Sequence, residues 1–99
     1  MKEIILSADG DSKVYLVPDA VADNLEEYCI RFCDEWLWSS PEAEQYRKNG
    51  GVCYNEEDFI DYLNKYIFPN QKSVLIKNLG SINEGNNPAK YRLCPRFNF

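Results

Sequence analysis

The strongest structural signal in the chain lies in residues 18–38, which read PDAVADNLEEYCIRFCDEWLW. Apolar residues recur there at the three- and four-residue spacing of an amphipathic helix, namely Val21, Leu25, Tyr28, Cys29, Phe32 and Trp36. Pro18 and Asp19 suit a first helical turn, because proline removes only an unpaired N–H group and a carboxylate faces the positive end of the helix dipole. The segment therefore predicts a helix that ends near Trp38 and buries one face.

Two short β-rich runs, residues 2–7 and 12–17, precede this helix. Between them stands Ala8-Asp9-Gly10-Asp11, and an Asp-Gly pair between such runs is a strong signal for a hairpin turn. The acidic turn does not match a calcium-binding loop, because Val14 occupies the position at which that loop requires glycine. We therefore expect an N-terminal β-hairpin.

Two further helices are predicted after the first. Ser39-Ser40-Pro41 begins a short one, because serine caps a helix and proline fits its first position, and glycine ends it at residues 49–51. Asn55 is a good N-cap for the next helix, which Pro69 ends. Its apolar stripe consists of Phe59, Tyr62, Leu63, Tyr66 and Ile67.

The last third of the chain gives weaker signals. Ser73 and Gly80 bracket an apolar run that fits either a short helix or a strand, and these end residues favour the helix. Residues 81–99 are rich in Gly, Asn and Pro and are expected to be mainly loop. No internal repeat or linker is visible, so residues 1–99 are expected to form one α+β domain. In it an N-terminal β-hairpin packs on two or three helices, followed by an extended C-terminal segment.

Composition excludes several kinds of active site. The 99 residues contain no histidine, which excludes Ser-His-Asp triads, Cys-His dyads and His-ligated metal sites. A glycine-rich phosphate-binding loop is also absent from the sequence. Catalysis would therefore depend on carboxylates, thiols, lysine or tyrosine alone. We expect a protein that is not an enzyme, with no catalytic residues and no cofactor.

The four cysteines, Cys29, Cys33, Cys53 and Cys94, allow two interpretations. A four-thiolate zinc site needs two closely spaced pairs, but Cys29 and Cys33 are one helical turn apart and the other two form no pair. Free cysteines otherwise behave as small core residues, and this is the interpretation we favour, with no metal. The alternative is a small enzyme or metal-dependent module that uses Cys53 or Cys94 together with carboxylates.

The chain shows no apolar run of the length that a signal peptide or a membrane-spanning helix requires. We therefore expect a cytoplasmic protein that does not contact a membrane.

Charge is distributed unevenly along the chain. Residues 1–66 contain 15 acidic and 6 basic residues, whereas residues 67–99 contain one acid and five bases. This asymmetry fits an acidic surface for a basic protein partner, a basic tail that docks on acidic helices, or plain solvated helix faces. Direct nucleic-acid binding is not expected from a chain with a net charge of −5.

The candidate partner-binding residues are helix carboxylates and aromatic residues outside the clear apolar stripes. Trp38 lies about 200° around the helix from Trp36, so both indoles do not face one core. Tryptophan is enriched at the centre of protein interfaces, although aromatic residues also fill the cores of small domains. The candidates are Asp34, Glu35, Trp38, Glu56, Glu57, Asp58, Asp61, Phe97 and Phe99.

Three segments carry a resemblance to known proteins: Val17-Pro18-Asp19, Gly51-Val52-Cys53-Tyr54-Asn55 and Pro95-Arg96-Phe97-Asn98-Phe99. In these and in its short, acidic build, the chain resembles small proteins carried by bacterial phages and mobile elements, among them anti-CRISPR inhibitors. The resemblance implies a non-catalytic inhibitor that occupies the basic surface of a nucleic-acid-binding host defence protein. It assigns no role to any individual residue.

Overall fold

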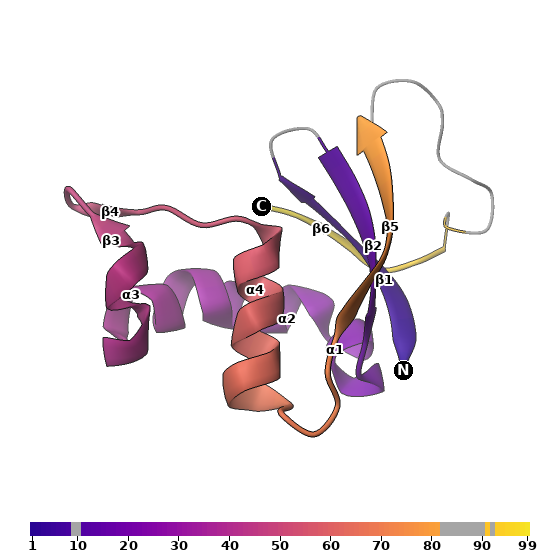
Figure 1. Cartoon of the computed structure of the whole chain (residues 1–99), viewed down its shortest axis with the longest axis horizontal. Helices are drawn as coiled ribbons and strands as arrows, with labels where there is room; N and C mark the ends of the chain where they lie inside the picture. Colours follow the sequence, from indigo (N-terminus) through magenta and orange to yellow (C-terminus); the bar gives the residue numbers. More distant parts are fainter. Residues whose placement is uncertain (9–10, 82–90, 92) are drawn as a thin grey trace.

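The fold consists of one four-stranded sheet with helices packed against one of its faces, as Figure 1 shows. The computed structural model describes residues 1–8, 11–81, 91 and 93–99. The strands of the sheet are β1 (Lys2–Ala8), β2 (Asp11–Val17), β5 (Val74–Ser81) and β6 (Arg96–Asn98), in the order β5-β2-β1-β6. β1 and β6 run parallel, and the other neighbouring pairs are antiparallel. The expected α+β class is confirmed.

β1 and β2 form the predicted hairpin, in which Lys2 lies opposite Val17. The predicted turn residues Asp9 and Gly10 lie outside the described part of the chain. Successive side chains of the two strands point to opposite faces of the sheet. The main core, shared with the helices, contains Ile4, Leu6, Tyr15 and Val17, and a smaller core on the other face contains Ile5, Val14 and Tyr91.

The predicted first helix runs from α1 (Asp19–Asp23) through α2 (Leu25–Ile30) and a π-helical segment, η1 (Arg31–Trp36), to α3 (Leu37–Ser39). It is interrupted at Asn24, whose φ and ψ are −135° and 39°. All six apolar residues of the predicted stripe lie in the main core or pack against it. The helical periodicity of residues 18–38 is therefore confirmed.

The later helical segments are shorter. The Ser40 side chain accepts a hydrogen bond from the Glu42 N–H and so caps the 3-10 helix η2 (Pro41–Tyr46). This helix ends before the predicted residues 49–51, because a small hairpin of β3 (Arg47–Lys48) and β4 (Gly51–Val52) follows it. Asn55 and Asp58 form a capping box that begins α4 (Glu56–Tyr62), which continues into the π-helical η3 (Leu63–Ile67). The predicted N-cap at Asn55 is confirmed.

The helix favoured for residues 73–80 is wrong, because this segment forms strand β5. Two contacts from outside the segment stabilise the strand. β5 pairs with β2, and the Asn64 side chain accepts from the Ser73 N–H at 2.7 Å and donates to the Ser73 carbonyl at 3.1 Å. The backbone N–H and C=O groups of the segment are thus hydrogen-bonded to β2 and to Asn64. In a short helix the same groups would have to bond to one another.

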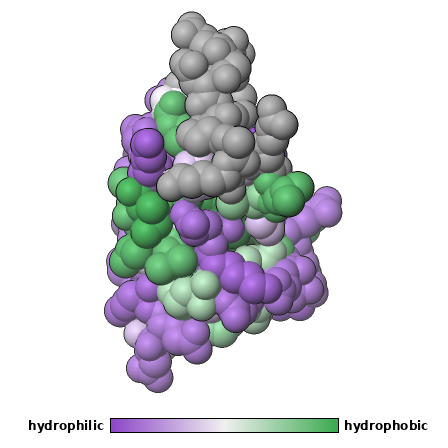
Figure 2. Space-filling model, turned by 90° about the vertical axis from the view of Figure 1, so that its right-hand side faces the viewer, coloured by the Kyte–Doolittle hydropathy of each residue, from purple (hydrophilic) through white to green (hydrophobic). Residues whose placement is uncertain are grey.

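β5 is an edge strand, and about half of each of the side chains of Val74, Leu75 and Ile76 is exposed. Figure 2 views the molecule from the side that holds the sheet and shows green apolar patches there. The pairing of β5 with β2 shifts register twice, and Lys77 projects from the strand as an exposed charge. Bulges and exposed lysines hinder the addition of a further strand at a sheet edge.

The aromatic side chain of Phe32 occupies the centre of the main core. Its ring lies 5.7 Å from Trp36, 5.5 Å from Tyr54, 5.6 Å from Phe59, 5.2 Å from Tyr62 and 6.3 Å from Phe99, measured between ring centroids. These distances are typical of favourable aromatic pairs. Phe32 therefore joins its own helix to the segment before α4, to α4 itself and to the last residue.

Phe32→Ala is expected to lower the free energy of unfolding by about 3–5 kcal/mol, since it removes a fully buried ring from several ring contacts. Ile30→Ala on the opposite face of the same helix is the control, with an expected change within about 0.5 kcal/mol. Urea denaturation followed by circular dichroism measures both. Equal losses for the two variants would contradict this description of the core.

Candidate functional site

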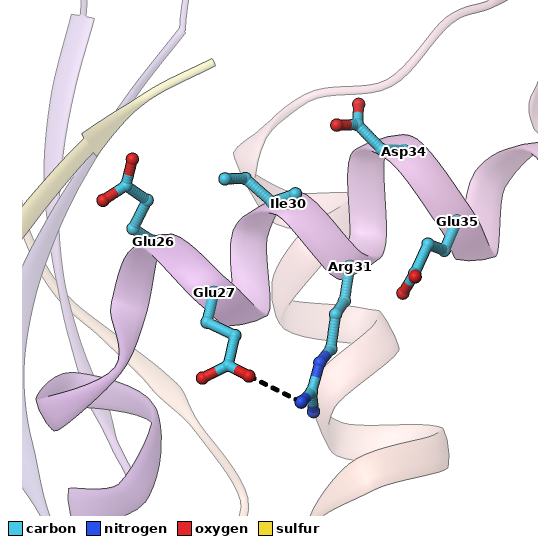
Figure 3. Close-up of a pocket in the computed structure, with 6 residues that line it drawn as sticks. All are labelled: Glu26, Glu27, Ile30, Arg31, Asp34 and Glu35. Carbon is cyan, nitrogen blue, oxygen red and sulfur yellow. Dashed lines mark hydrogen bonds and ion pairs between the residues drawn. The ribbon is translucent and has the colours of Figure 1, made fainter.

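The outward surface of the first helix carries two parallel rows of side chains. Burial of Phe32 turns the opposite side of α2, η1 and α3 toward water. Figure 3 shows one row that contains Glu26, Ile30 and Asp34, and a second that contains Glu27, Arg31 and Glu35. Trp38 continues the first row at the same four-residue interval. These seven residues are called the outer helix face below.

The outer helix face exposes two large apolar side chains among its charges. Ile30 is 42% exposed and Trp38 is 50% exposed. No aromatic ring in the described part of the chain contacts the Trp38 indole, whereas Trp36 packs on Tyr62 with 5.0 Å between the ring centroids. The two tryptophans thus lie in different environments, and the exposed one follows Asp34 by four residues along the helix.

Four carboxylates and one guanidinium give the outer helix face a net negative charge. Arg31 is paired within the face, since its Nη2 lies 2.6 Å from the Glu27 carboxylate. The same guanidinium lies 5.7 Å from the centroid of the Tyr28 ring. Glu26, Asp34 and Glu35 form no ion pair with any described residue. The side chains line a shallow, open hollow of about 560 Å³. Around it, the face presents three carboxylates without an ion pair among the described residues, together with the apolar side chain of Ile30.

The carboxylates of α4 have different environments. Glu56 is only 5% exposed, and its carboxylate lies 2.7 Å from Lys13 Nζ on β2. The hydrogen bond to Glu56 is the main cause that raises the pKa of Lys13 above its ordinary value. Asp58 is half-buried, accepts the Asn55 N–H, and has a pKa raised mainly by desolvation. Only Glu57 and Asp61 remain as exposed carboxylates of this helix. Glu56 is therefore not part of the exposed acidic surface, because it is buried and forms an ion pair with Lys13.

Glu56→Gln is expected to lower the free energy of unfolding by about 2 kcal/mol. The change leaves the mostly buried Lys13 ammonium without its closest carboxylate. Glu57, 3.4 Å from Lys13 Nζ, compensates in part. The matched variant Glu57→Gln removes a carboxylate whose side chain is 64% exposed, and its expected cost is below about 1 kcal/mol. Thermal and urea unfolding at neutral pH compare the two, and a larger loss for Glu57→Gln would refute the assignment.

The C-terminal aromatics pack on the protein itself. Phe99 lies 5.7 Å from Phe59 and 5.0 Å from Phe97 between ring centroids. The Phe99 N–H donates to the Ser7 carbonyl at 2.8 Å, next to the parallel pairing of β6 with β1. Both phenylalanines are only partly exposed and pack against the main core. The structure thus places Phe97 and Phe99 in the body of the protein, packed against the main core.

The basic residues of the last third do not pair with the acidic helices in the part of the chain that the structure describes. Lys72 Nζ donates to the Asn64 carbonyl, and Arg96 donates to the Tyr91 carbonyl. Lys90 and Arg92 lie outside the described residues. The carboxylates of the outer helix face therefore meet no internal base other than Arg31 among the residues described.

The cysteines are distributed over different environments. Cys29 is buried, and desolvation raises the pKa of its thiol. Cys33 and Cys94 are partly buried, and desolvation raises the pKa of both thiols as well. Cys53 is exposed, so the expectation of a core residue is wrong there. The described residues include no group of three or more Cys, Asp or Glu side chains placed to bind a metal ion.

Comparison with protein-family models, with curated proteins and with solved structures finds no match to this chain. None of the helices in the described residues is long and apolar enough to cross a membrane.

Proposed function

We propose that this protein is a non-catalytic interaction module whose outer helix face docks on the basic surface of a protein partner. One observation carries the proposal: Ile30 and Trp38, both about half exposed, share a helix with Glu26, Asp34 and Glu35, and these three carboxylates form no ion pair in the described part of the chain. Figure 3 shows Ile30 between Glu26 and Asp34. A half-exposed tryptophan leaves apolar surface in contact with water until a partner covers it. Unpaired carboxylates around it select a partner of opposite charge.

The two components of the face contribute differently to binding. Trp38 and Ile30 supply the contact area that determines how slowly the complex dissociates. Glu26, Asp34 and Glu35 lie at the surface, where a single charge pair adds little affinity but a group of charges accelerates association and excludes acidic partners. Ionic strength is therefore expected to weaken binding, because salt screens exposed charges beyond about 8–10 Å.

The partner we propose is a protein whose basic surface binds nucleic acid, such as a host defence protein. Surfaces that hold a phosphate backbone are rich in Lys and Arg. An acidic protein seated on such a surface excludes the nucleic acid by occupancy, without any chemical step. The net charge of −5 and the concentration of acids in residues 1–66 support this choice of partner.

The test compares three forms of the protein in quantitative affinity capture from a bacterial lysate. The first is the native chain, and the second carries Glu26→Gln, Asp34→Asn and Glu35→Gln. The third carries Glu3→Gln, Asp11→Asn and Glu44→Gln, which remove the same charge at exposed positions outside the outer helix face. A genuine partner should be captured about tenfold less by the second form only, since three exposed charge pairs together contribute roughly 1.5 kcal/mol.

Trp38→Ala gives an independent measure of the same contact. It is expected to weaken binding of the captured protein by about 2 kcal/mol while thermal stability stays unchanged. Adding the native chain should also displace nucleic acid from that protein. Equal capture by all three charge forms, together with full binding by Trp38→Ala, would show that the outer helix face is not the docking surface.

A further inference from the structure

A second hollow, of about 300 Å³, lies between the sheet and the helix formed by α4 and η3. Tyr15 of β2 and Leu75 of β5 line it from the sheet, while Ile60, Glu57 and Asp61 line it from α4. Ser73, just before β5, also lines it. This space, called the α4 hollow below, is separate from the outer helix face and shares no residue with it.

The α4 hollow combines apolar walls with negative charge. Tyr15 and Ile60 are largely buried, and their side chains together with Leu75 form an apolar lining. Glu57 and Asp61 are four residues apart on α4 and so share one side of the helix. The pKa of Tyr15 is raised to about 12, chiefly by desolvation, and Glu57 and Asp61 add to the rise while Lys13 opposes it. Both carboxylates of the hollow therefore act on the tyrosine hydroxyl, in the same direction as Glu56 and against Lys13.

The nearest base leaves part of this charge uncompensated. Lys13 Nζ lies 2.7 Å from Glu56 and 3.4 Å from Glu57. Asp61 forms no ion pair within the described residues. A cation in the α4 hollow could therefore pair with Asp61, which has no other ion pair among the described residues. It could also pair with Glu57, whose contact with Lys13 is longer than that of Glu56.

Ser73, which lines the α4 hollow, provides a second and independent observation. The residue is 3% exposed, and its Oγ is buried with no hydrogen-bond partner among the residues described. Buried hydroxyls are almost always hydrogen-bonded, so this one calls for an explanation. Asn64 holds the backbone of Ser73 on both sides, through the Ser73 N–H and its carbonyl, and thereby fixes the residue beside the hollow.

We propose that the α4 hollow binds an alkylammonium group, either the side chain of a lysine on a protein or one end of a free polyamine. An ammonium group donates three hydrogen bonds, for which the Glu57 and Asp61 carboxylates and the Ser73 hydroxyl are acceptors. The methylene groups behind it would pack on Tyr15, Ile60 and Leu75. Because a bare metal ion prefers more oxygen ligands than two carboxylates supply, the mixed apolar and acidic lining favours the organic cation.

The test titrates the isotope-labelled full chain with three probes and follows the backbone amide signals by NMR. The probes are Nα-acetyl-lysine methylamide, spermidine, and the uncharged Nα-acetyl-norleucine methylamide. Saturable shifts at Tyr15, Ile60 and Leu75 are expected from a cationic probe and not from the norleucine derivative. Saturation by the lysine derivative at lower concentration than by spermidine assigns the site to a protein lysine, and the reverse order assigns it to a polyamine.

Variants separate the site from the general negative charge of the protein. Asp61→Asn is expected to weaken binding of the better probe about tenfold, whereas the charge-matched Asp34→Asn on the outer helix face should leave it unchanged. Ser73→Ala should weaken binding several-fold and yet keep or raise the midpoint of thermal unfolding, because it removes a buried hydroxyl that has no partner among the described residues of the free protein.

Two results would overturn the proposal. One is the absence of saturable shifts at the α4 hollow with both cationic probes. The other is equal weakening by Asp61→Asn and Asp34→Asn, which would reduce the effect to net charge. Neither result bears on capture by the outer helix face, so the two proposals fail independently.

Discussion

The packing of the Phe32 ring is the interaction on which the rest of this structure depends. Rings from its own helix and from three other segments contact it, and the buried position of this one side chain sets the rotation of the first helix about its axis. A helix with one face fixed against a core can present only the opposite face to water. The exposure of Ile30, Asp34 and Trp38 is thus a consequence of how the core is packed.

The same constraint explains which charges are free for a partner. Glu56 lies on the core side of α4, and there its charge is paired with Lys13 from β2. On the outer helix face Arg31 forms an ion pair with Glu27, but the other three carboxylates of that face form no ion pair with any described residue. The C-terminal phenylalanines complete the aromatic core, whereas Trp38, four residues after Asp34, is half exposed. The orientation of α4 places the charge of Glu56 inside the fold, and the orientation of the first helix leaves the carboxylates of the outer helix face exposed.

Local signals in the sequence predict the elements that depend on local contacts. The Asn55 cap and the helical periodicity through Trp38 need only neighbouring residues, and both are present. The strand at Val74–Ser81 depends on pairing with β2, which is far away in the sequence, and on Asn64, nine residues before Ser73. The residues at the ends of the segment do not reveal either contact, and they favour a helix. The burial of Glu56 depends in the same way on Lys13. Asp34, Glu35 and Trp38 are candidates from the sequence, whereas Glu26 and Ile30 are not, although the four-residue spacing back from Asp34 leads to both.

The orientation of the first helix is the central claim, and its two tryptophans report on it directly. The measurement is relaxation of the two indole N–H signals by a soluble gadolinium chelate in NMR spectra of the full chain. Because Trp38 is half exposed while Trp36 packs among Tyr46, Tyr62 and Tyr66, we expect strong relaxation of the Trp38 signal and clear protection of Trp36. Equal relaxation of the two signals, or stronger relaxation of Trp36, would contradict the packing around Phe32 and the docking face derived from it.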